Sequence, residues 1–75
     1  MRFVGDSIQE YINEIGKKMI EKYNISADTV IKNMLYTKFY GYIRKNYSFV
    51  KDKSPEYWAD KIHCLADTGE QFSVN

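Results

Sequence analysis

The feature that most constrains this chain is the spacing of its apolar residues between positions 8 and 23. They recur every three or four residues, the period at which side chains share one face of an α-helix. The members of this stripe are Ile8, Tyr11, Ile12, Ile15, Met19, Ile20 and Tyr23. Ser7 and Glu10 have the spacing of a capping box, so we predict a helix that begins after Ser7 and stops at Asn24.

Two further helical segments are predicted between residues 26 and 47. Ser26 can cap a short second helix, whose apolar residues are Val30, Ile31, Met34 and Leu35. Thr37 offers another cap, and the apolar stripe continues through Phe39, Tyr40, Ile43 and Tyr47. Residues 38–47 therefore form either a third helix or a bent continuation of the second.

The next segment predicts a break followed by a last helix. Residues 51–53 are charged and are predicted to form a loop. Ser54 is a suitable cap, and Pro55 fits the first helical position, where its missing N–H is not needed. Trp58, Ile62 and Leu65 then share one face, and Gly69 is a suitable stop.

These patterns predict an all-α fold, a small bundle of about four short helices. Seventy-five residues suffice for one domain, residues 1–75, and we expect loose termini at 1–6 and 70–75. So short a chain has a thin core, and aromatic side chains, 16% of the residues, can supply much of its area. Trp58 is the residue that we most expect to be buried.

Composition narrows the functional classes. A formal charge of +1 does not by itself recruit nucleic acid or an anionic membrane. A lone cysteine, Cys64, forms no internal disulfide and fits a reducing compartment, so we expect a cytoplasmic protein. The sequence also predicts no signal or transit peptide and no membrane-spanning segment.

Catalytic chemistry has few candidate residues here. The single histidine, His63, and Cys64 are neighbours, and consecutive side chains on a helix point about 100° apart, so they do not face each other. We expect Cys64 near the core face and His63 half exposed. The sequence has no CxxC, HxxxH, calcium-loop or glycine-rich phosphate motif, so we predict no enzyme activity, no metal and no cofactor.

The least ordinary segment is residues 36–53, which interleave five basic residues and six aromatics with one acid. On a helix, Lys38, Tyr42 and Lys45 align on one face and Arg44 borders them. We expect Tyr42 to be the aromatic left outside the core. The predicted partner-binding residues are Lys38, Tyr42, Arg44, Lys45 and Lys51, although tyrosines packed at a core rim and solvated lysines would explain the same pattern.

Several residues resemble those of a family of short, uncharacterised helical proteins from bacteria and their mobile elements, classed as a domain of unknown function. They are Tyr23-Asn24, Val30 with Lys32 and Met34, Tyr42-Ile43, Tyr47, Glu56-Tyr57 and Ile62. The resemblance covers roughly residues 8–66 and implies a compact helical unit, some relatives of which occur near toxin-like genes. The family commonly has Leu-His-Thr where this chain has Val50-Lys51-Asp52, so a role of that histidine does not carry over.

Two functions can use the basic and aromatic segment. The first is a non-enzymatic protein-binding module, such as a regulator, inhibitor or antitoxin-like partner of another bacterial or phage protein. The alternative is a nucleic-acid-binding regulator that uses residues 36–53 for phosphate contacts and base stacking. A homodimer that completes the thin core is compatible with either function.

Overall fold

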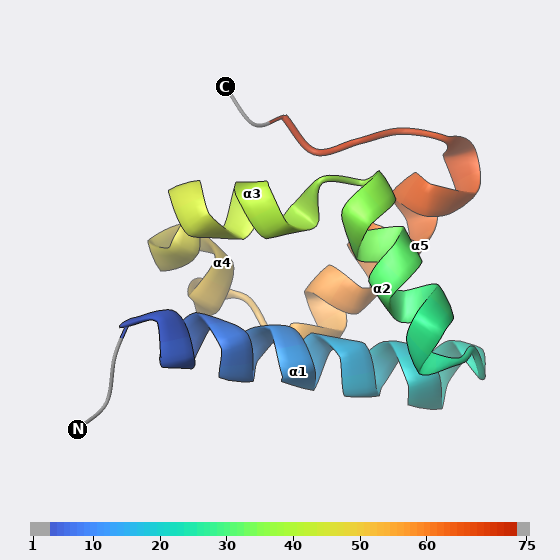
Figure 1. The fold of residues 1–75 in the computed structure, drawn as a ribbon, viewed down its shortest axis with the longest axis horizontal. Coiled ribbons are helices and arrows are strands. Elements are labelled where there is room, and N and C mark those ends of the chain that lie inside the picture. The colour runs from blue at the N-terminus through green and yellow to red at the C-terminus, as the bar shows by residue number, and fades with distance from the viewer. Residues whose placement is uncertain (1–3, 74–75) are drawn as a thin grey trace.

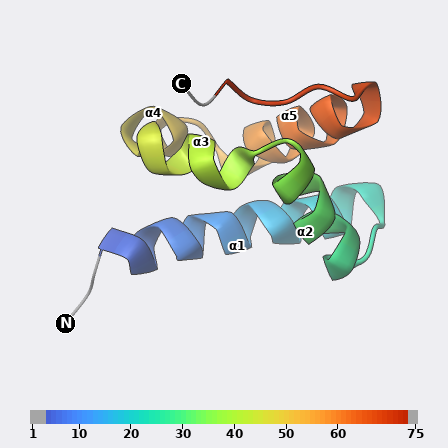
Figure 2. The same ribbon diagram turned by 45° about the horizontal axis from the view of Figure 1, so that its top comes forward.

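The computed structural model describes residues 4–73, which form five helices without a strand. They are α1 (Val4–Tyr23), α2 (Ala27–Tyr36), α3 (Phe39–Lys45), α4 (Tyr47–Asp52) and α5 (Pro55–Thr68). The all-α prediction is confirmed. The helices α1 and α3 run along the long axis of the molecule, α2 joins them at one end, and α5 lies behind (Figures 1 and 2).

Predicted helix ends are confirmed at α2 and α5. Ser26 caps α2, because its side chain accepts a hydrogen bond from the Thr29 amide. Ser54 caps α5 in the same way through the Tyr57 amide, with Pro55 at the first helical position. Gly69 ends α5 in the left-handed conformation, with φ of 79°, which glycine adopts without a steric penalty.

Three predicted boundaries are wrong. The helix α1 begins at Val4, so Ser7 lies inside it and does not start it. Thr37 does not cap the third helix; it ends α2 and is fully buried, and its hydroxyl donates to the Asn33 carbonyl at 2.8 Å. The third helix ends at Lys45, because Asn46 leaves the helical conformation with φ of −127°.

The predicted loop at residues 51–53 is also wrong in part, since α4 extends to Asp52. This short helix is held by burial at one residue, Val50, which is fully buried. The Val50 carbonyl accepts a hydrogen bond from the Trp58 indole N–H at 2.8 Å, and the Tyr11 hydroxyl lies 3.0 Å from the same oxygen. Tertiary contacts therefore form a helix that periodicity does not reveal.

The core lies between α1 and the other helices, and Trp58 is buried in it, as predicted, with 2% of its surface exposed. The other buried apolar residues are Ile12, Ile15, Met19, Val30, Met34, Phe39, Ile43, Val50, Ala59, Ile62 and Phe72. Trp58 lies against Phe39 at a ring-centroid distance of 5.9 Å and against Phe72 at 6.0 Å.

The prediction of a loose C-terminal tail is wrong for the part that the structure describes, residues 70–73. The chain turns back after α5 and runs past α3 (Figure 1). Phe72 is 8% exposed, and its amide donates to the Thr37 carbonyl at 2.8 Å. At the other end, residues 4–6 belong to α1, and the remainder of the two predicted loose termini lies outside the described residues.

Candidate functional site

Tyr42, the centre of the predicted partner-binding strip, is not left outside the core. Its ring stacks on Phe72 at a centroid distance of 4.8 Å and also contacts Trp58 at 5.8 Å and Phe39 at 6.4 Å. The expectation fails because the C-terminal segment returns to cover this side of α3. Tyr42 is therefore a core-rim residue.

The four predicted basic residues are exposed but do not form one strip. Lys38 precedes α3 in a left-handed conformation, with φ of 65°, so it does not continue the helical face that Lys45 occupies. The Lys51 ammonium lies 5.5 Å from the centroid of the Tyr47 ring. Arg44 lies beside Tyr40, and the Arg44 guanidinium donates a hydrogen bond to the Tyr40 carbonyl at 3.4 Å.

A groove lies along α1 on the side of α2 and α3, and Arg44 is at its edge. It consists of two adjoining hollows of about 370 and 520 Å³ that share Gln9, Ile12 and Tyr40. The other residues that line it are Ile8, Asn13, Gly16, Lys17, Ile20, Ala27, Val30, Ile31, Met34, Leu35 and Arg44. We refer to this surface as the α1–α2–α3 groove.

Three of the apolar side chains that line the groove are well exposed to solvent. Leu35 is 61% exposed, Ile31 47% and Ile20 39%, while other members of the same stripes are buried. Sequence periodicity placed all three on core-facing stripes, because a stripe of 100° or more includes residues at its margins. Which margin stays uncovered depends on how the helices cross.

Local sequence explains how the groove forms. Ile8, Ile12, Gly16 and Ile20 are each four residues apart and so share one face of α1. A Cβ atom at Gly16 would lie 3.4 Å from Val30 Cγ1, an ordinary van der Waals distance, so α1 and α2 pack against each other at this point. The isoleucines on either side then form the walls of a long, shallow depression.

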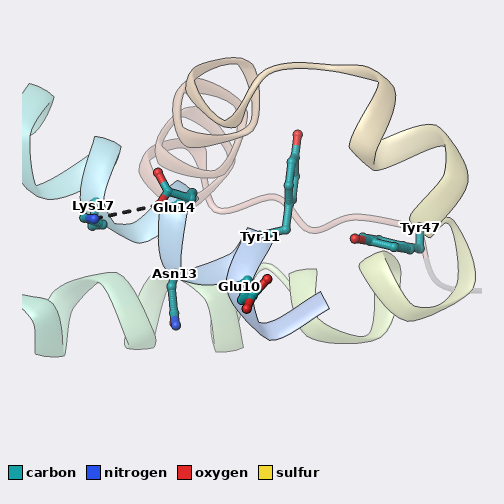
Figure 3. Close-up of a pocket in the computed structure, with 6 residues that line it drawn as sticks. All are labelled: Glu10, Tyr11, Asn13, Glu14, Lys17 and Tyr47. Atoms are coloured by element: carbon teal, nitrogen blue, oxygen red, sulfur yellow. Dashed lines mark ion pairs between the residues drawn. The ribbon is translucent and has the colours of Figure 1, made fainter. Parts of the chain in front are cut away.

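A broad hollow of about 690 Å³ also lies on α1, and every residue that lines it has a polar or charged side-chain group (Figure 3). Five of its lining residues come from α1, namely Glu10, Tyr11, Asn13, Glu14 and Lys17, and the sixth is Tyr47. Tyr11 extends past the hollow toward the segment between α4 and α5, where its hydroxyl lies against the Val50 and Lys53 carbonyls (Figure 3). Burial, and secondarily the Tyr47 hydroxyl, raises the pKa of Tyr11. The hollow thus lies outside the contact by which Tyr11 joins α1 to Val50 and Lys53.

Exposed aromatic rings gather on a second surface, formed by α4 and the start of α5. Phe49 and Tyr57 are both about half exposed. The Lys53 ammonium lies between them, 5.5 Å from the Phe49 centroid and 5.6 Å from that of Tyr57. This cluster carries the exposed aromatic and basic character that the sequence predicted for Tyr42 and Lys45.

A polar cluster joins the C-terminal end of α1 to α5. The Lys22 ammonium lies 3.0 Å from a Glu56 oxygen and 2.9 Å from an Asp60 oxygen. The Tyr23 hydroxyl donates to Asp60 at 2.5 Å, and its ring stacks on His63 at 3.8 Å. Lys22 and Tyr23 on α1 thus bond to Glu56 and Asp60 on α5 and link the two helices.

His63 and Cys64 do not form a catalytic pair. His63 is half-buried, as predicted, and its ring faces Tyr23. Cys64 is exposed, so its predicted place near the core face is wrong. The reason is geometric: Cys64 lies two residues after buried Ile62, about 200° around α5 from the core.

Acidification should weaken the contacts that the Asp60 carboxylate makes with Lys22 and Tyr23. Hydrogen bonding by Tyr23, and next by Lys22, holds the pKa of Asp60 below its ordinary value. Its contribution to stability is therefore complete above the unfolded-state pKa of about 3.9 and is lost as pH falls through the lower folded-state value. We expect the free energy of unfolding to fall less steeply with acidification below about pH 4 in Asp60→Asn than in the original chain. Denaturant titrations across this range check it, and identical slopes would contradict it.

Neither a metal-binding cluster nor a membrane-spanning helix is found among residues 4–73. Within that range, no three His, Cys, Asp or Glu side chains are grouped so as to hold a metal ion. None of the helices in the same range has both the length and the apolar character needed to cross a membrane.

Comparisons of the chain with protein-family models, with curated proteins and with solved structures gave no match. The geometry and chemistry of the α1–α2–α3 groove make it the candidate site.

Proposed function

We propose that this chain is a small, non-enzymatic protein-binding module that docks a partner in the α1–α2–α3 groove. The observation that carries the proposal is the exposure of Ile20, Ile31 and Leu35 along two adjoining hollows that share lining residues. Contiguous exposed apolar surface with a polar rim is typical of protein interaction sites. In the cytoplasm, such a module would act as a regulator, inhibitor or antitoxin-like partner of another bacterial or phage protein.

The resemblance to short uncharacterised bacterial and mobile-element proteins supports the proposal in one respect. The residues that carry it are mostly packing residues, including Val30, Met34, Ile43 and Ile62, all buried here. A shared packing pattern favours a common helical scaffold, and interaction specificity then resides in exposed residues such as Leu35. We accordingly propose membership of that family as part of the same hypothesis.

Substitution at Leu35 tests the docking surface. Leu35→Glu places a charge in the groove and should weaken partner binding about 30-fold or more, the loss typical of a binding hot spot of about 2 kcal/mol. Phe49→Glu makes the same chemical change on the α4–α5 surface and serves as the matched control. Leu35 is 61% exposed and Phe49 is 49% exposed, so we expect each variant to fold.

The original chain and the two variants each serve as bait in a pull-down from native cell extract. The affinity of each for the captured protein is then measured. A partner lost with Leu35→Glu and retained with Phe49→Glu supports the groove. A partner that still binds the Leu35→Glu variant but no longer binds the Phe49→Glu variant would place the binding site on the surface of α4 and α5.

Nucleic-acid binding is the second candidate, and the Phe49, Lys53 and Tyr57 cluster favours it. Exposed rings beside an ammonium group can stack on bases and contact a phosphate. Asp52 and Glu56 lie in the same stretch of sequence, so its local charge is nearly balanced. Nuclease treatment of the same pull-down distinguishes the two functions, because material lost on treatment would favour nucleic acid.

A further inference from the structure

We propose that the partner presents an amphipathic helix with acidic flanks to the α1–α2–α3 groove. This inference rests on the proposed function and specifies its ligand. It follows from three properties of the groove: its length, the spacing of its apolar residues and the sign of the charges at its rim.

The length of the groove matches a short helix. Its α1 wall extends from Ile8 to Ile20, and the twelve steps between these residues span about 18 Å at 1.5 Å per residue. A partner helix of about three turns covers that distance. An extended strand is a poorer fit because the groove is bordered by helices, whose backbone groups are already paired and offer no free sheet edge.

The apolar lining is arranged to receive side chains from one helical face. Ile12 and Val30 form the deep part and are almost fully buried, while Ile20, Ile31 and Leu35 stand at the margins. Such a profile suits apolar residues spaced i, i+3 or i+4 and i+7 on an inserted helix. The remaining faces of that helix stay in water and can carry charge.

The rim is basic. Lys17 on α1 and Arg44 on α3 are the charged side chains among the residues that line the groove in the described part of the chain, and no carboxylate lines it. Lys17 pairs with Glu14 at 3.7 Å, but both side chains are mostly exposed, so the pair is weak and exchangeable. Arg44 donates to a backbone carbonyl and retains further donors for a carboxylate. Acidic flanks on the partner therefore complement both ends.

Two synthetic peptides of fourteen residues test this inference directly. Both carry the same apolar helical face, and one has Glu and the other Lys at the flanking positions. Fluorescence anisotropy of the labelled peptides measures their affinity for the full chain at low and high salt. We expect the acidic peptide to bind at least about tenfold more tightly at low salt, with the preference shrinking as salt screens the rim charges.

Charge reversal locates the effect. The double variant Lys17→Glu with Arg44→Glu should abolish or invert the preference for the acidic peptide. Lys45→Glu with Lys61→Glu makes the same net change at exposed positions that do not line the groove, and it should preserve the preference. If the control pair removes the preference equally, net charge rather than the groove rim causes it, and the inference is wrong.

The remaining outcomes separate this inference from the proposed function. Equal binding of both peptides, lost with Leu35→Glu, overturns the acidic partner while leaving the groove as a docking site. Binding of neither peptide overturns the helical ligand, and the pull-down then decides on the docking function. A dimer seen by light scattering that dissociates with Leu35→Glu would show that a second copy of this chain fills the groove.

Discussion

Trp58→Ala is expected to lower the free energy of unfolding by about 3 to 5 kcal/mol, the usual cost of truncating a large buried aromatic residue. The side chain is 2% exposed and touches rings from α3, α4, α5 and the C-terminal segment. A domain of this length has a total stability of about 4 to 11 kcal/mol. The loss is therefore a large share of the total, and a loss at the upper end of its range exceeds a total stability at the lower end of its range. Thermal melting followed by circular dichroism checks the result, and a melting curve like that of the original chain would contradict the packing described here.

The matched control is Trp58→Phe, which retains most of the apolar contact. It removes the indole N–H that donates to the Val50 carbonyl at 2.8 Å. Since the Tyr11 hydroxyl remains 3.0 Å from that oxygen, we expect a loss closer to that of one hydrogen bond, about 1 kcal/mol, together with some loss of packing. The contrast between the two variants separates the volume of the side chain from its polar contact.

Phe72→Ala is expected to cost about 3 kcal/mol, the lower end for a buried aromatic residue because Phe72 lies at the edge of the core. The substitution removes the ring that stacks on Tyr42 at 4.8 Å and contacts Phe39 at 5.3 Å. Chemical denaturation monitored by Trp58 fluorescence measures the effect, since Phe72 lies 6.0 Å from that indole.

Ser73→Ala is the control for Phe72→Ala, because Ser73 is exposed and adjacent. Its effect should remain within about 0.5 kcal/mol. Equal stability of the Phe72→Ala variant and the control would mean that the C-terminal segment does not dock on α3, and Tyr42 would then be more exposed than described.

The sequence predicted those parts of the fold that local chemistry determines. Ser26 and Ser54 cap their helices through hydrogen bonds to amides three residues later, and Gly69 adopts the one conformation that ends α5 without strain. Trp58 is buried because it belongs to an apolar stripe on a helix that must cover the core. Each of these outcomes depends on residues that are close in the sequence.

The missed features depend on residues far apart in the sequence. The helix α4 is stabilised by contacts of Val50 with Tyr11 and Trp58, and the C-terminal segment is placed by the bond between Phe72 and Thr37. No periodicity encodes either contact. Because Phe72 covers Tyr42, the error about the tail also produced the wrong expectation that Tyr42 lies outside the core.

The candidate groove was outside the sequence prediction for a related reason. Leu35 and Val30 both belong to the apolar stripe of α2, yet Leu35 is 61% exposed and Val30 is buried. Periodicity assigns both to the inward face, and only the crossing of α2 over α1 at Gly16 decides which is covered. Of the five predicted partner-binding residues, Arg44 lines this groove.

The most direct test of the docking surface is a nuclear magnetic resonance titration with the acidic peptide, following methyl groups for the groove and aromatic signals for the α4–α5 surface. We expect the largest shifts at Ile20, Ile31 and Leu35, with Phe49 and Tyr57 almost unchanged. Shifts confined to Phe49 and Tyr57, with the groove methyl groups unmoved, would contradict the account and move the binding site to α4 and α5.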